Sequence, residues 1–283
     1  MVCLWGVSMI FIDFECFLHD WLAVAIDVVN KKKHVIVNDA EKLKELYHAN
    51  KNNIWVGFNI KHYDQYIFKG IMCDFNPKDV NDFIIKLGGA GYQFSSLFRK
   101  IPLNIYDVMT GIDRGLKTFE GFMGNNIKET SVPFDIHRKL TDKELKEVIE
   151  YCTHDVENTI EVFLERKDDF EAHLGLVKVA CEGKGLDLSL LSNTKVQLSA
   201  IILEAAKKSH DDEFNIDIPY NLQVTKYRHV VDWYLNSENR NYDKSLTTEV
   251  AGVEHVFGWG GVHGAIEKYC GEGYFLNMDI ALT

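Results

Sequence analysis

Short runs of apolar residues separated by polar breaks dominate the first forty residues of the chain. Residues 8–15 combine apolar, β-branched and aromatic side chains, and residues 21–29 resume this pattern after a polar break. Residues 33–37 follow the turn-like Asn30-Lys31-Lys32. Runs of this length and composition are typical of strands. Because the connections are short, the pattern predicts an antiparallel meander of three strands.

The following segments alternate between helical and extended patterns. In residues 40–49, Leu43, Leu46 and Tyr47 recur at helical spacing behind an Asn-Asp pair that can cap a helix. Residues 54–58 and 103–106 have strand-like composition, and residues 63–69 have a helical pattern. This order of elements predicts an α/β fold in which helices flank a mixed sheet.

The clearest helical signal lies further along the chain. Thr141-Asp142-Lys143-Glu144 has the form of a capping box, and apolar residues then recur every three or four positions as far as Phe163. We place a domain boundary after this helix, which gives an α/β domain of residues 1–171 and a remainder of residues 172–283. Residues 190–208 and 223–235 have helical patterns, so the smaller C-terminal segment is predicted to be mainly helical.

Composition and charge narrow the function classes. Of the 283 residues, 46% are hydrophobic and 26% charged, as in ordinary soluble globular proteins. The net charge of −11 argues against a sequence-independent duplex binder, although a site in which carboxylates hold metal ions would also be acidic. The six cysteines include no C-x-x-C pair, which indicates free thiols in a reducing compartment. The apolar start is interrupted by acidic residues and resembles neither a signal peptide nor a membrane span, so we expect a cytoplasmic protein without a membrane partner.

Four acidic residues fall where an α/β sheet presents side chains. Asp13 and Glu15 lie two apart on the first predicted strand and therefore face the same side, and Asp64 follows the fourth predicted strand. Asp155 lies on the clearest helix, one turn after Tyr151. Each feature alone is common, since an acidic pair in a strand usually belongs to a solvated edge. Two acids inside an otherwise apolar strand, however, need a cationic partner, and grouped carboxylates are the ligands that hard divalent cations prefer.

Three motifs in this order resemble a known enzyme family. Residues 11–15 resemble the D-x-E motif of the DEDD 3′–5′ exonucleases, residues 59–64 resemble their N-x(2–3)-(F/Y)-D motif, and residues 151–155 resemble the tyrosine-containing Y-x(3)-D motif. Order and spacing are similar to those of the proofreading domains of phage-type family B DNA polymerases, including protein-primed ones. The resemblance implies an RNase H-like fold over about residues 8–170. It also implies a protein that is encoded by a virus or present in a bacterial host cell.

The resemblance also implies a mechanism. Asp13, Glu15 and Asp155 would hold one of two Mg²⁺ or Mn²⁺ ions, and Asp64 would position the second, which it shares with Asp13. Tyr151 would orient the attacking water. The expected reaction is hydrolysis that releases nucleoside monophosphates from a single-stranded DNA 3′ end, including that of a primer–template.

Several residues around the motifs are candidates for nucleic-acid contact. Asn59 belongs to the second motif, and Phe58 and Tyr63 flank it and could either stack on bases or fill the core. Lys128 lies roughly where the family has its K-x(2)-h lysine, although the hydrophobic residue falls one position late, at Val132. The family's (S/T)-L-x(2)-h motif has no clear counterpart. The motifs do not distinguish DNA from RNA, and the oligomeric state stays open.

The C-terminal residues resemble the beginning of a polymerase domain. Residues 276–281 are similar to the start of polymerase motif A, in which Asp279 would be the catalytic carboxylate. The resemblance implies a chain truncated at this motif, so we do not expect it to extend primers. Two alternatives remain. In the first, the chain is a DNA-directed DNA polymerase, as an intact relative would be. In the second, it is an inactive prophage remnant that only binds nucleic acid.

Overall fold

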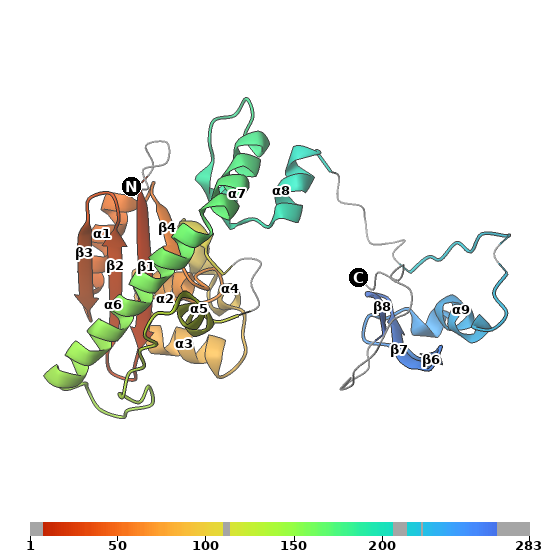
Figure 1. The fold of residues 1–283 in the computed structure, drawn as a ribbon, viewed down its shortest axis with the longest axis horizontal. Helices are drawn as coiled ribbons and strands as arrows, with labels where there is room; N and C mark the ends of the chain where they lie inside the picture. Colours follow the sequence, from red (N-terminus) through yellow and green to blue (C-terminus); the bar gives the residue numbers. More distant parts are fainter. Residues whose placement is uncertain (1–7, 110–113, 206–213, 222, 265–283) are drawn as a thin grey trace. The chain divides into compact units, whose positions relative to one another are not determined.

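The computed structural model describes residues 8–109, 114–205, 214–221 and 223–264. It divides into two compact units, Met1–Ala206 and Lys207–Thr283 (Figure 1). The boundary expected from the sequence, after residue 171, falls inside the first unit.

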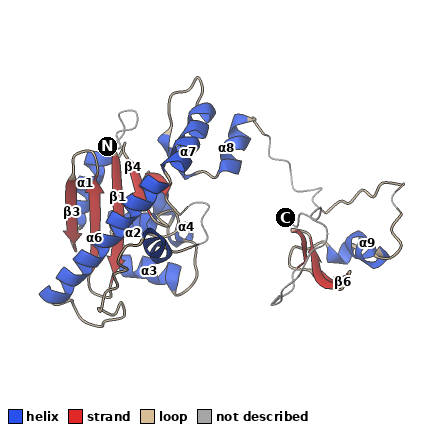
Figure 2. Ribbon diagram, in the orientation of Figure 1, coloured by secondary structure: helices blue, strands red, loops and turns tan. Residues whose placement is uncertain are grey.

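A five-stranded mixed sheet forms the centre of the first unit, with the order β3-β2-β1-β4-β5 (Figure 2). β1, β2 and β3 are antiparallel neighbours, whereas β4 runs parallel to β1 and β5 runs parallel to β4. The strands are β1 (Met9–Cys16), β2 (Trp21–Asp27), β3 (Lys32–Val37), β4 (Ile54–Gly57) and β5 (Asn104–Asp107). This confirms the predicted meander and the predicted α/β fold with a mixed sheet, and the arrangement is consistent with the expected RNase H-like architecture.

The two faces of the sheet pack against different helices because side chains alternate along each strand. Met9 and Phe11 of β1 belong to one hydrophobic cluster with α6 (Asp142–Glu165), whose Phe163 ring lies 5.4 Å from that of Phe11. Ile10 and Ile12 belong to a second cluster with α1 (Ala40–Asn50), α2 (Asp64–Met72) and α3 (Pro77–Ile85). In Figure 1, α6 runs across β1 and β2, the strands that it contacts.

Local sequence signals explain where the main helices begin. The Thr141 side chain accepts a hydrogen bond from the Glu144 amide, and the Glu144 carboxylate accepts one from the Thr141 amide. This capping box satisfies amides that the first helical turn leaves without partners. Asp39 caps α1 by accepting from the Lys42 amide. Both predicted N-termini are confirmed.

Shorter helices complete the first unit and include several that the sequence pattern did not predict. The expected helix over residues 190–208 is shorter, because a capping box between Thr194 and Gln197 makes the observed helix begin at Lys195. The remaining elements are α4 (Gly91–Phe94), η1 (Ser96–Lys100), α5 (Leu116–Met123), α7 (Lys167–Ala180), η2 (Leu188–Ser192) and α8 (Lys195–Ile202).

The second unit adds a sheet that the sequence pattern did not predict to a C-terminal segment that otherwise carries the expected helices. It contains α9 (Arg228–Leu235) and η4 (Ser237–Asn239), but also an antiparallel sheet of β6 (Ser245–Val250), β7 (Val253–Gly258) and β8 (Gly261–Gly264). Ala251 and Gly252 both have positive φ, at 54° and 83°, as a tight hairpin turn requires. The turn therefore favours a hairpin here, although the flanking residues do not show a strong alternation of apolar and polar positions.

Within the ranges that the structure describes, every helix is too short or too polar to cross a membrane.

Candidate active site

The first motif lies on the central strand of the sheet. Asp13 and Glu15 share the face of β1 that carries Met9 and Phe11, and this is the face that α6 covers. Ile12 and Phe14, between and beside them, point into the opposite core. The predicted common orientation of the two acids is therefore confirmed, and it directs both carboxylates toward α6.

The second and third motifs bring further acids to the same place. Asp64 is the first residue of α2, which follows the carboxyl end of β4, and β4 is parallel to β1. The charge of Asp64 raises the pKa of Glu15, and the charge of Asp13 raises the pKa of Asp64. Asp155 reaches the site from α6 and acts on Asp13 and Glu15 in the same way. The charges of the four predicted carboxylates therefore influence one another, and we refer to the four as the carboxylate cluster; of the four, Asp13 and Glu15 bring ligand atoms within 4.8 Å of each other.

Burial and mutual repulsion make ionisation of this cluster unfavourable. Burial, and next the charge of Asp155, raises the pKa of Asp13 from 3.8 to about 7. Burial raises the pKa of Glu15 well above its usual value, and Asp13, Asp155 and Asp64 raise it further. The pKa of Asp64 rises for the same two reasons, with Asp13 as the nearest charge. Grouped, buried carboxylates of this kind need protons or cations to offset their charge.

Lys117 of α5 supplies one such cation. Its Nζ lies 2.6 Å from Asp155 Oδ1 and 3.3 Å from Glu120 Oε1. The same Nζ is 4.7 Å from the centre of the Tyr151 ring. Glu120 is fully buried and also accepts a hydrogen bond from Asn158 Nδ2 at 3.0 Å. α5 is therefore fixed to α6 on the side of the site where Asp155 lies.

Tyr151 stands beside the cluster, as the third motif predicts. Burial raises the pKa of its hydroxyl, and Asp155, Glu15 and Asp13 raise it further. The phenol therefore stays protonated at neutral pH and can donate a hydrogen bond.

Cys152 contributes a thiol to the site. Its Sγ donates to Asp13 Oδ2 at 3.4 Å, and the ligand atoms of Asp13, Glu15 and Cys152 all lie within 4.8 Å of one another. Burial, and then Asp13 and Glu15, raises the pKa of this thiol well above its usual value. A protonated thiol holds the carboxylate by a hydrogen bond and is not a thiolate ligand.

The donor set fits a hard divalent cation. Asp64 Oδ1 is buried and has no hydrogen-bond partner, although a buried carboxylate oxygen ordinarily finds one. The cluster holds four carboxylates, and within the described residues an ion pair joins Lys117 to one of them, Asp155. Oxygen-rich sites with excess negative charge suit Mg²⁺ or Mn²⁺.

The loop between β4 and α2 fixes the position of Asp64. Asp107, at the end of β5, accepts hydrogen bonds from the amides of Asn59 (2.9 Å) and Lys61 (3.0 Å). Asn59 has a positive φ of 62°. A Cβ on Gly57 would come within 2.8 Å of Ile60 Cβ, so only glycine fits at the beginning of this loop. These contacts set the start of α2 against β1.

The residues expected to contact nucleic acid are placed as follows. Phe58 packs against the α6-side core, with its ring 6.3 Å from that of Phe119. The Tyr63 hydroxyl donates to Asn81 Oδ1 at 2.6 Å, and its ring packs against the α2-side core. Both thus have structural partners, and their stacking on bases stays a prediction. Lys128 is exposed on an irregular segment, where its DNA contact also stays a prediction.

Asp279, the expected remnant of polymerase motif A, lies outside the described residues.

Sequence reasoning did not identify the contacts that Lys117, Glu120, Cys152 and Asp107 make at the site. Lys117 was visible only as a lysine within the segment between the second and third motifs. Glu120 and Asp107 could have been found only as acids in apolar surroundings.

Comparisons with known proteins find similarity among solved structures. No protein-family model matches the sequence, and no curated protein matches it. Among solved structures, the chain is similar to the family B DNA polymerase from the hyperthermophilic archaeon Pyrobaculum calidifontis, with 12% sequence identity and a TM-score of 0.44. The similarity covers 70% of this chain and 28% of the polymerase, so the chain spans little more than a quarter of that protein's length.

Proposed function

We propose that this chain is a metal-dependent 3′–5′ exonuclease that releases nucleoside monophosphates from the 3′ end of single-stranded DNA. The observation that supports the proposal is the mutual electrostatic influence of Asp13, Glu15, Asp64 and Asp155, which extends to Tyr151. The order of these residues along the chain is that of the three exonuclease motifs. We therefore assign the chain to the proofreading region of a phage-type family B DNA polymerase.

The four carboxylates would hold the metal, and the motifs imply two Mg²⁺ or Mn²⁺ ions. When bound, these ions supply positive charge to the scissile phosphate and lower the pKa of the attacking water. The unpartnered oxygen of Asp64 and the repulsion within the cluster support this assignment.

The chain's own residues orient the reactants. The Tyr151 hydroxyl, protonated at neutral pH, would hold the attacking water by a hydrogen bond. Lys117 offsets the charge of Asp155 and so lowers the repulsion that an approaching phosphodiester meets. Cys152 keeps the Asp13 carboxylate in one orientation through its thiol.

The strand would enter past the second motif. Asn59 and Lys128 would make polar contacts with the backbone or bases, and Phe58 and Tyr63 would offer the edges of partly buried rings. A primer–template whose 3′ end is frayed would present the same single strand.

Stepwise digestion of end-labelled oligonucleotides tests the proposal. A 5′-labelled single strand should shorten progressively from its 3′ end with Mg²⁺ or Mn²⁺, and EDTA should stop the reaction. Asp13→Ala combined with Glu15→Ala should abolish it, because two carboxylate ligands are lost. An RNA strand of the same sequence, run in parallel, measures the preference for DNA.

The matched control is Glu157→Gln, which removes an exposed carboxylate two positions from Asp155 on the same helix. It should retain wild-type activity. Equal digestion by the Asp13→Ala, Glu15→Ala double variant would overturn the assignment, as would strand binding by the wild type without any cleavage.

A further inference from the structure

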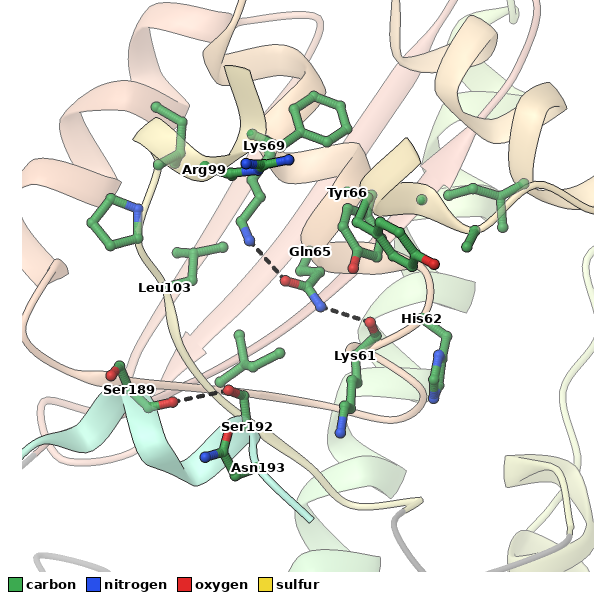
Figure 3. Close-up of a pocket in the computed structure, with 18 of the residues that line it drawn as sticks. Lys61, His62, Gln65, Tyr66, Lys69, Arg99, Leu103, Ser189, Ser192 and Asn193 are labelled. Carbon is green, nitrogen blue, oxygen red and sulfur yellow. Dashed lines mark hydrogen bonds between the residues drawn. The ribbon is translucent and has the colours of Figure 1, made fainter. Parts of the chain in front are cut away.

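A large cavity lies in the first unit, lined by residues other than the four carboxylates. Its volume is about 790 Å³, within the range of small-molecule sites. Its walls come from α2 and the residues before it, the glycine-rich segment 88–91, η1 with the residues that lead into β5, and η2 (Figure 3).

The cavity is cationic, although the protein is acidic. Lys61, Lys69 and Arg99 line it, and no carboxylate does so among the described residues. In the same part of the chain, none of these three forms an ion pair. Cations gathered without acidic partners, in a chain of net charge −11, mark a place for an anionic ligand.

Lys69 is held inside the cavity by a short hydrogen-bond chain. Its Nζ donates to Gln65 Oε1 at 2.8 Å, and Gln65 Nε2 donates to the Lys61 carbonyl at 2.6 Å (Figure 3). Burial lowers the pKa of Lys69 to about 8. An anion placed beside this ammonium would stabilise its charged form, so protonation of Lys69 and binding of an anion promote each other.

Aromatic rings lie next to these cations. The centre of the Tyr66 ring is 5.6 Å from Lys69 Nζ. Burial raises the pKa of Tyr66, and the neighbouring Tyr92 raises it further. Tyr92 is 66% exposed, which leaves its ring available to a ligand. A Cβ on Gly91 would come within 2.2 Å of the Tyr66 ring, so glycine is needed for the ring to lie against this segment.

Polar groups without charge line the opposite wall. Ser189, Ser192 and Asn193 of η2 and its C-cap face the cavity with hydroxyl and amide groups (Figure 3). Cations, rings and neutral hydrogen-bonding groups are the three kinds of partner that a phosphate, a base and a sugar require.

We propose that this cavity binds a nucleotide, with its phosphate on Lys69 and Arg99 and its base against Tyr66 and Tyr92. The cavity differs from the carboxylate cluster in its lining, which includes none of the four acids, although Gln65, next to Asp64, belongs to it. The nucleotide is either a free mononucleotide or one unit of a single strand.

Calorimetric titration with dAMP in EDTA tests this site without contribution from metal at the carboxylates. The wild type should bind dAMP at least tenfold more tightly than inorganic phosphate or deoxyadenosine alone, because phosphate and base are held together. Lys69→Met should weaken dAMP binding at least tenfold, and Tyr92→Ala should weaken it several-fold. Lys146→Met, at an exposed lysine of α6, is the matched control and should bind as the wild type does.

Competition with a short oligothymidylate identifies the source. Displacement of dAMP assigns the cavity to a nucleotide within a strand, and undiminished dAMP binding assigns it to a free mononucleotide. Equal dAMP affinity in Lys69→Met and Lys146→Met, with both variants melting as the wild type does, would overturn the proposal. So would dAMP binding no tighter than that of phosphate. The titration in EDTA is independent of the proposed exonuclease function, so an inactive protein would still give one of these outcomes.

Discussion

Replacing Asp13 by Asn should stabilise the metal-free protein while removing a ligand. Asp13 lies among Glu15, Asp64 and Asp155, and burial together with Asp155 raises its pKa from 3.8 to about 7. Asn has nearly the same shape, carries no charge and can still accept the hydrogen bond that Cys152 donates. The substitution therefore isolates the effect of one buried charge.

The sign and size follow from linkage. Between pH 3.8 and 7 the folded state keeps a proton on Asp13 that the unfolded state has lost, so the free energy of unfolding falls as pH rises through this window. At about 1.36 kcal/mol per pH unit, the loss approaches roughly 4 kcal/mol when the window has been crossed. Because Asn does not titrate, we expect Asp13→Asn to be about 2–4 kcal/mol more stable than wild type at pH 8. The two should be equal near pH 4.

Urea unfolding from pH 4 to pH 8 in EDTA, followed by circular dichroism, measures this difference. Glu157→Gln controls for the loss of an exposed negative charge on α6 and should shift stability little at any pH. Adding Mn²⁺ at pH 8 should stabilise the wild type more than Asp13→Asn, because the wild type retains the full ligand set. If Asp13→Asn were no more stable than Glu157→Gln at pH 8, Asp13 would not be the buried, repelled carboxylate that we describe.

Three further predictions concern the neighbours of this cluster. Tyr151→Phe should lower exonuclease activity at least tenfold, while Mn²⁺ affinity, measured by calorimetry, stays within about twofold. Asp155→Ala should weaken both activity and Mn²⁺ affinity. Loss of Mn²⁺ binding in Tyr151→Phe would assign the tyrosine a packing role. Lys117→Met should lower the metal-free free energy of unfolding at pH 8 by about 1–3 kcal/mol, because it leaves Asp155 uncompensated, and a urea curve that matches wild type would contradict the pairing. Gly57→Ala should cost about 1–3 kcal/mol in the same assay and also reduce activity, since the new methyl group would push Ile60 and displace Asp64; unchanged activity would show that the loop yields elsewhere.

The sequence predicted those parts of the fold whose signals are local. The β1 strand is apolar except at Asp13 and Glu15, and α6 begins with a capping box, so strand, helix and the orientation of the acids all followed. The short helices between β4 and α6 carry weaker patterns because loops and neighbouring chain segments, rather than long amphipathic faces, decide their ends. The β6–β7 hairpin depends on positive φ angles at both residues 251 and 252, and the alanine at position 251 does not predict such an angle.

The electrostatic partners of the site lay beyond sequence reasoning for a different reason. Lys117 meets Asp155 across 38 positions of chain, and Asp107 reaches the Asn59 amide across 48. No spacing rule links residues so far apart, and contact between them depends on how α5 and β5 pack. The motifs located the carboxylates, whereas their counterion and the group that fixes the second motif became visible only in three dimensions.

The pinned loop between β4 and α2 has a consequence for how this protein tolerates change in length. Gly57 packs against Ile60, and Asp107 receives the amides of Asn59 and Lys61, so the loop has no slack. One inserted residue between Gly57 and Asp64 could not keep all of these contacts at once, because the added chain would have to break away at the glycine or at the amides that Asp107 holds. The start of α2 would then move relative to β1, and Asp64 would move with it. In this chain the length of the segment between Gly57 and Asp64 is thus constrained by its backbone contacts as well as by its side chains.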